Sequence, residues 1–235
     1  MNDTTESHSK NLTLSINNDF FGLSFLQKDI EDDKEYTRFV KGVEAQIRRS
    51  NEYKEFISYL KSELDINFCF VMNKMHSTEV KIEMHHTPFT LYDIVDCVIK
   101  KLISLEKPFN SFLVAYLVMQ LHYANKAGLI PLSSTMHQYV HSESANNVQI
   151  PRDAIIGNIE EFFKEYKDYI SPDLKLLYQR CLATKYDKDT DKTVDSQYQS
   201  KNMKEEYMKR VRSIKVRSTP ITCKESKKIE EVEND

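Results

Sequence analysis

The chain has 235 residues, of which 40% are hydrophobic and 29% are charged, and its formal net charge is −3. This length is enough for one substantial domain with its own core, and the composition excludes a fully disordered or collagen-like chain. The longest apolar run, residues 112–119, falls well short of the roughly 20 residues that a membrane-spanning helix needs. The N-terminus also lacks a basic start followed by an apolar stretch. We therefore expect a cytoplasmic protein, in the host cytoplasm if it is phage-encoded, with no membrane partner.

Cysteine and glycine usage excludes further classes. The four cysteines are widely spaced and no secretory signal precedes them, so we expect free thiols rather than disulfides. The chain has only four glycines and contains neither a GxxxxGK[ST] nor a GxGxxG pattern. P-loop and Rossmann nucleotide-binding folds are therefore not expected.

Composition divides the chain into three regions. Residues 1–18 are polar and predict a flexible N-terminal arm, and residues 19–184 predict a single globular domain without a linker. Residues 185–235 mix basic and acidic side chains densely, which predicts a charged and flexible tail.

The first half of the domain contains both helical and strand patterns. Apolar residues at three- and four-residue steps predict one or two helices over residues 33–64, broken near Ser50. Residues 66–72 and 79–84 have strand-like patterns, and we expect them to pair as a hairpin through residues 73–78. Thr90, with Asp93 three residues later, predicts the start of a helix that ends before Pro108.

The second half is mainly helical. A nearly all-apolar helix is expected from about residue 110 to residue 126, ending at Gly128, followed by a short extended piece at residues 129–132. Ser133 or Ser134 can cap a brief helix that carries His137 and His141. Two amphipathic helices are expected over residues 152–169 and 172–184. The predicted fold class is α+β and predominantly helical.

Histidine clustering is the strongest chemical signal in the sequence. Six of the seven histidines lie between residues 76 and 141. His137 and His141 are four residues apart, so on a helix their rings project from one face and can bind the same metal ion. His85 and His86 are adjacent at a strand end, where side chains alternate between faces. We therefore expect one of this pair to bind metal and the other to accept a proton from water.

Two strings carry a resemblance to a known family. IEMHHTPF at residues 82–89 and GLIPLSSTMHQYVH at residues 128–141 resemble the two halves of the HNH, or ββα-metal, nuclease motif. The closing His-x3-His is similar to that of the colicin-type DNases. The resemblance implies a small ββα-metal-like core at about residues 66–145, into which a helical hairpin is inserted.

The same resemblance implies a mechanism and a set of site residues. His85, His137 and His141 would bind one divalent ion (Mg, Mn, Ni or Zn). His86 would be the general base that activates a water molecule, which then hydrolyses a phosphodiester bond in DNA or RNA. Asn125 and Asp93 are candidate supporting residues, and Glu83, Asp93 and Asp96 are candidates to orient a histidine.

A basic segment in the tail is the candidate nucleic-acid contact. Residues 201–217 contain seven basic and two acidic side chains. A cluster of this kind can hold phosphates, although it is also typical of a solvated surface. The candidate nucleic-acid-binding residues are Lys209, Arg210, Arg212, Lys215 and Arg217.

Two other interpretations remain open at this point. In the first, a noncatalytic phage-type accessory protein keeps an HNH-like fold and acts by binding a protein or a nucleic acid. The polar ends and the content of Lys, Tyr, Asn and Asp are compatible with such a protein. In the second, the chain is a helical interaction protein whose histidines are incidental.

Overall fold

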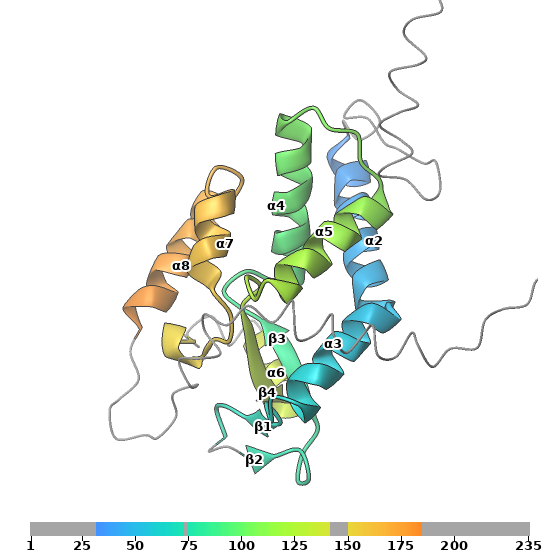
Figure 1. Cartoon of the computed structure of the whole chain (residues 1–235). Coiled ribbons are helices and arrows are strands. Elements are labelled where there is room, and N and C mark those ends of the chain that lie inside the picture. The colour runs from blue at the N-terminus through green and yellow to red at the C-terminus, as the bar shows by residue number, and fades with distance from the viewer. Residues whose placement is uncertain (1–31, 73–74, 142–149, 185–235) are drawn as a thin grey trace, which may run out of the picture.

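The computed structural model describes residues 32–72, 75–141 and 150–184. This part of the chain is mostly helical and contains two small two-stranded sheets, so the predicted α+β class is confirmed (Figure 1). The predicted N-terminal arm and charged tail lie outside the described residues. None of the described helices is both long and apolar enough to cross a bilayer.

The first two helices meet at a single serine. Helix α2 (Asp33–Arg49) begins after Asp32, whose carboxylate accepts a hydrogen bond from the backbone N–H of Lys34 at 2.8 Å. Ser50 has an extended backbone (φ −63°, ψ 145°), which ends α2, and its side chain accepts from the N–H of Tyr53 to cap α3 (Asn51–Ser62). The predicted break near Ser50 is therefore confirmed.

Helices α4 (Leu91–Ser104) and α5 (Ser111–Tyr123) pack against each other and against α2 (Figure 1). Thr90 and Asp93 form a reciprocal capping box at the start of α4, as the sequence predicts. Asn110 caps α5 by accepting from the N–H of Leu113. The buried faces of these helices form a large part of the hydrophobic core.

The strand pairing differs from the predicted hairpin. Strand β3 (Ile82–His86) pairs antiparallel with β4 (Leu129–Ser133), not with the segment at residues 66–72. Strand β1 (Phe68–Cys69) pairs instead with β2 (Met75–His76), which lies in the predicted connection. All five residues of β4 are buried, so β4 provides the apolar partner that β3 needs. Helices α4 and α5 lie between β3 and β4 in the chain.

The C-terminal helices also differ in part from the prediction. The expected helix over residues 152–169 is a single 3₁₀ turn (Arg152–Ala154) followed, after a break, by α7 (Ile159–Tyr166). Gly157 lies in the break with φ 111°, a conformation that ends helical continuity. Helix α8 (Pro172–Ala183) is close to its predicted position and begins after the capping residue Ser171.

Gly128 does not end helix α5, contrary to the sequence prediction, but lies where another part of the backbone passes close to it. Helix α5 ends at Tyr123, and Asn125 takes the left-handed conformation (φ 55°) that often follows a helix. At Gly128 a Cβ atom would lie 2.1 Å from the carbonyl oxygen of Thr87. The residue is therefore glycine because the backbone of the β3 end passes too close for any side chain.

Candidate metal centre

His85 and His86 point to opposite faces of β3. The ring of His85 faces helix α6 (Ser134–His141), where its centroid is 5.1 Å from that of His137 and 4.8 Å from that of His141. The ring of His86 contacts His122 of α5 and Tyr53 of α3. The predicted placement of the two side chains on alternate faces of the strand is therefore confirmed.

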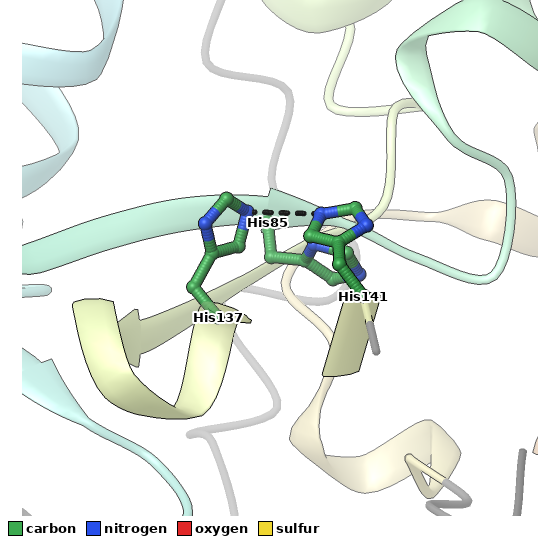
Figure 2. A group of neighbouring side chains, drawn as sticks. All are labelled: His85, His137 and His141. Atoms are coloured by element: carbon green, nitrogen blue, oxygen red, sulfur yellow. Dashed lines mark hydrogen bonds between the residues drawn. The ribbon is translucent and has the colours of Figure 1, made fainter. Parts of the chain in front are cut away.

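Helix α6 brings its two histidines together. Ser133 at the end of β4 accepts from the N–H of Met136, which starts the helix directly after the strand. His137 and His141 are one turn apart, and their Nε2 atoms are 3.3 Å from each other (Figure 2). Two nitrogens bound to one tetrahedral zinc ion at 2.0–2.1 Å would be about 3.3 Å apart. This pair is therefore already spaced as two ligands of one ion.

His85 completes a group of three. One ligand atom from each of His85, His137 and His141 lies within 4.8 Å of the others. His85 comes from β3 and the other two from α6, so an ion between them would join the helix to the sheet (Figure 2). The structure thus brings together the three predicted ligands, although they lie up to 56 positions apart in the sequence.

A carboxylate orients the ring of His137. Glu83 Oε2 is 2.8 Å from His137 Nδ1, so this nitrogen donates and leaves the Nε2 lone pair directed at His141. Glu83 also accepts hydrogen bonds from Lys81 and Ser134. The hydrogen bond from Lys81 is the main cause that lowers the pKa of Glu83, so the carboxylate stays ionised. Of the three acidic residues considered as orienting groups, Glu83 occupies that position.

The cluster favours neutral imidazoles, the form that binds metal. Burial, followed by the neighbouring rings of His141 and His137, lowers the pKa of His85 to about 3. Burial and the ring of His141 also lower the pKa of His137, against the opposing effect of Glu83. Protons therefore compete only weakly with a metal ion for these two nitrogens.

A cavity of about 230 Å³ opens beside the three histidines. Arg48, at the end of α2, lies on its wall with a half-exposed side chain. The other residues that line the cavity are Met84, His85, His86, Thr90, Leu91, His137 and His141. No acidic side chain is among these described lining residues, so the cavity wall is basic and apolar.

His86 lacks the environment that a general base requires. Its side chain is only 4% exposed, and its Nε2 is 2.9 Å from His122 Nε2. His122 Nδ1 donates to the carbonyl oxygen of Val118, so in neutral His122 the Nε2 atom accepts the hydrogen bond from His86. His86 Nδ1 is then an unprotonated acceptor, and it has no hydrogen-bond partner within the described residues. His86 is thus a buried histidine that reaches the cavity wall but has its Nε2 directed at His122.

The candidate supporting residues lie elsewhere. The carboxylate of Asp93 accepts from the backbone N–H and the hydroxyl of Thr90 in the capping box of α4. Asn125 is buried after α5, where its backbone carbonyl oxygen accepts a hydrogen bond from the backbone N–H of Asn158. The candidate nucleic-acid-binding residues Lys209, Arg210, Arg212, Lys215 and Arg217 lie outside the described residues.

Two features of the site were missed by the sequence reasoning. His122 as the partner of His86 is 36 residues away, and no local pattern indicates it. The position of Arg48 beside the histidines is likewise not indicated by the sequence, because Arg48 lies in an ordinary amphipathic helix. Glu83 could have been selected from the three candidates, since it is two residues before His85 and therefore on the same face of the strand.

Comparison with known families changes the functional interpretation. A family described as Bacteriophage G278-like virion protein matches residues 1–218. The chain belongs to this family. No curated protein and no solved structure matches it.

Membership of the G278-like virion family corrects three expectations. The chain does not belong to the HNH nuclease family, and the nuclease function inferred from residues 82–89 and 128–141 is wrong. The expected cytoplasmic location is also wrong, because a virion protein is part of the phage particle. The alternative of a noncatalytic phage-type protein is closer to the family than the nuclease interpretation.

Proposed function

We propose that this G278-like virion protein is a noncatalytic component of the phage particle in which one zinc ion fastens α6 to the β3–β4 sheet. The observation that carries the proposal is the group formed by His85, His137 and His141, with the 3.3 Å separation between the two α6 nitrogens. The protein acts by binding neighbouring proteins of the particle, and the ion stabilises the fold that makes those contacts.

The choice of ion follows from the donor atoms. Imidazole nitrogens suit zinc and nickel, whereas magnesium and manganese prefer carboxylate and water oxygens. Three imidazoles and no carboxylate form the described group. The 3.3 Å separation of the two α6 nitrogens fits a tetrahedral ion rather than a square-planar one, which favours zinc over nickel. The β3–β4–α6 unit resembles a ββα-metal arrangement in its order of elements only, and a noncatalytic role fits the burial of His86 against His122.

The test is a measurement of bound zinc and of thermal stability on the full chain. We expect one zinc ion per chain after removal of free metal, and a melting temperature about 5–10 °C higher when zinc is in hundredfold excess over its Kd. His137→Ala should lose both effects. His76→Ala is the control, because His76 is exposed on β2 and does not belong to the group.

The proposal is wrong if the chain retains no zinc, or if His137→Ala and His76→Ala bind zinc equally well. Retention of zinc without any change in melting temperature would also contradict it, because the ion would then not contribute to the fold.

A further inference from the structure

Within the described residues, the three histidines leave one coordination position of a tetrahedral ion without a ligand. Within the described residues, the group that can hold an ion consists of His85, His137 and His141 alone. Glu83 cannot supply the fourth ligand in this arrangement, because it is bound to Nδ1 of His137, away from the Nε2 atom that faces His141. A site with three protein ligands and one open position can accept an external group.

The open position has access to a space of suitable size. All three histidines line the cavity of about 230 Å³. This volume accommodates a small group of a few heavy atoms. Met84 and Leu91 provide apolar wall, which lowers the local dielectric and strengthens electrostatic attraction inside the cavity.

The charge around the cavity selects an anion. Arg48 is on the wall, and a divalent ion at the histidines would add two further positive charges. Nε and Nη2 of Arg48 donate to Glu44 Oε1, and Nη1 lies on the other branch of the guanidinium, from which it can donate to another group.

We propose that the ion held by His85, His137 and His141 takes a carboxylate as its fourth ligand, with one carboxylate oxygen on the ion and the other on the guanidinium of Arg48. A carboxylate fits this bridging position, because its two oxygens can bind two cationic groups at once, one oxygen on the ion and the other accepting a charge-assisted hydrogen bond from Arg48 Nη1. The inference rests on the proposed zinc site. The carboxylate comes from a free anion or from an acidic side chain of a second copy of the chain.

The test uses the full chain loaded with Co²⁺, whose visible spectrum reports the coordination of the ion. Titration with acetate should change the spectrum in a saturable way. Arg48→Gln should raise the acetate Kd about tenfold, which corresponds to about 1.4 kcal/mol, while the Co²⁺ affinity stays the same. Arg49→Gln is the matched control, because it removes the same charge from the adjacent exposed position of α2.

A dilution series without added anion identifies the source of the carboxylate. A carboxylate-bound spectrum that is lost on dilution assigns the ligand to a second copy of the chain. A spectrum that is independent of protein concentration and responds to acetate assigns it to a free anion. Both results support the proposal.

Three results would overturn it. The first is no spectral response to acetate in protein diluted until its spectrum no longer depends on concentration, while Co²⁺ remains bound. The second is an equal loss of acetate affinity in Arg48→Gln and Arg49→Gln. The third is a response to inorganic phosphate but not to acetate. A failure to bind Co²⁺ would instead contradict the zinc site itself, and the separate measurement of metal affinity distinguishes that failure from the other three.

Discussion

At the scale of single residues, the site depends on side chains that fix the tautomers of histidines. Glu83 holds His137 with Nδ1 protonated, so Nε2 is free to bind an ion. Val118 holds His122 in the same tautomer through its carbonyl oxygen, and His122 in turn fixes His86. The neighbouring histidines of β3 therefore have different partners, since His85 faces His137 and His141 whereas His86 is hydrogen-bonded to His122.

Replacement of Glu83 tests the first of these contacts. Glu83→Gln removes the negative charge that holds the proton on His137 Nδ1, so we expect zinc affinity to fall about 10- to 100-fold. Competition against a chromophoric chelator measures this change. Glu55→Gln, at an exposed position of α3, should leave the affinity unchanged. An equal affinity in wild type and Glu83→Gln would show that the carboxylate does not support the ligand.

The buried pair formed by His86 and His122 predicts a pH dependence of stability. Burial lowers the pKa of His122 from 6.5 to about 4 and lowers that of His86 well below 6.5. Between these values the unfolded chain binds protons that the folded chain excludes, so stability falls as the pH decreases from about 6.5 towards 4. His122 alone contributes a loss of about 3 kcal/mol over this window.

Urea unfolding at several pH values, with EDTA present to remove metal effects, measures this dependence. His122→Leu should reduce the slope between pH 6.5 and pH 4, whereas His76→Gln on exposed β2 should not. A slope of stability against pH in His122→Leu that equals that of the wild type would contradict the account.

At the scale of elements, we expect α6 to depend on the proposed metal site more than the other described helices do. None of its residues is buried, and Met136 and Val140 are only partly buried against the core. We therefore expect zinc to slow hydrogen exchange of the amides of residues 134–141, with little effect on α4, whose core face is already buried. Equal protection of α6 with and without zinc would argue against its attachment through the ion.

Two glycines give a paired test of the fold. Gly128→Ala would place a Cβ against Thr87 O, and we expect a loss of at least 1–3 kcal/mol of unfolding free energy from overpacking. Gly42 lies within α2 with no atom near the position of a Cβ, so Gly42→Ala should stabilise the protein by about 0.5–1 kcal/mol. Urea denaturation measures both, and a stabilising Gly128→Ala would refute the close-approach argument.

Local signals predicted the helices better than the strands. The helices α2, α3 and α4 were predictable because apolar periodicity and the caps at Ser50 and Thr90 are local signals. The pairing of β3 was not, because the nearest apolar run at residues 66–72 is a plausible partner, whereas β4 is separated from β3 by two helices. Pairing across an insertion is decided by tertiary packing, which a local pattern does not record.

In the candidate site, too, local sequence patterns predicted some features and tertiary packing determined the others. The four-residue spacing of His137 and His141 predicted their convergence, and the alternation of strand faces predicted that His85 and His86 would differ. The role of His86 could not be predicted, since it is set by His122 on a distant helix. The resemblance of two short strings to a nuclease motif located the three clustered histidines but assigned the wrong function.

At the scale of the whole molecule, the chain is a virion protein with a helical core and a small sheet at which three histidines converge. The central claim is that these histidines hold zinc as part of the folded structure. Such an ion would link β3 to α6. These two elements lie before and after the α4–α5 hairpin in the chain.

X-ray absorption at the zinc edge, on the full chain loaded with one equivalent of zinc, tests this claim most directly. The account predicts three imidazole nitrogens at about 2.0–2.1 Å in a four-coordinate site, with one imidazole lost in His141→Ala. A shell of oxygens alone, or a spectrum unchanged in His141→Ala, would contradict it.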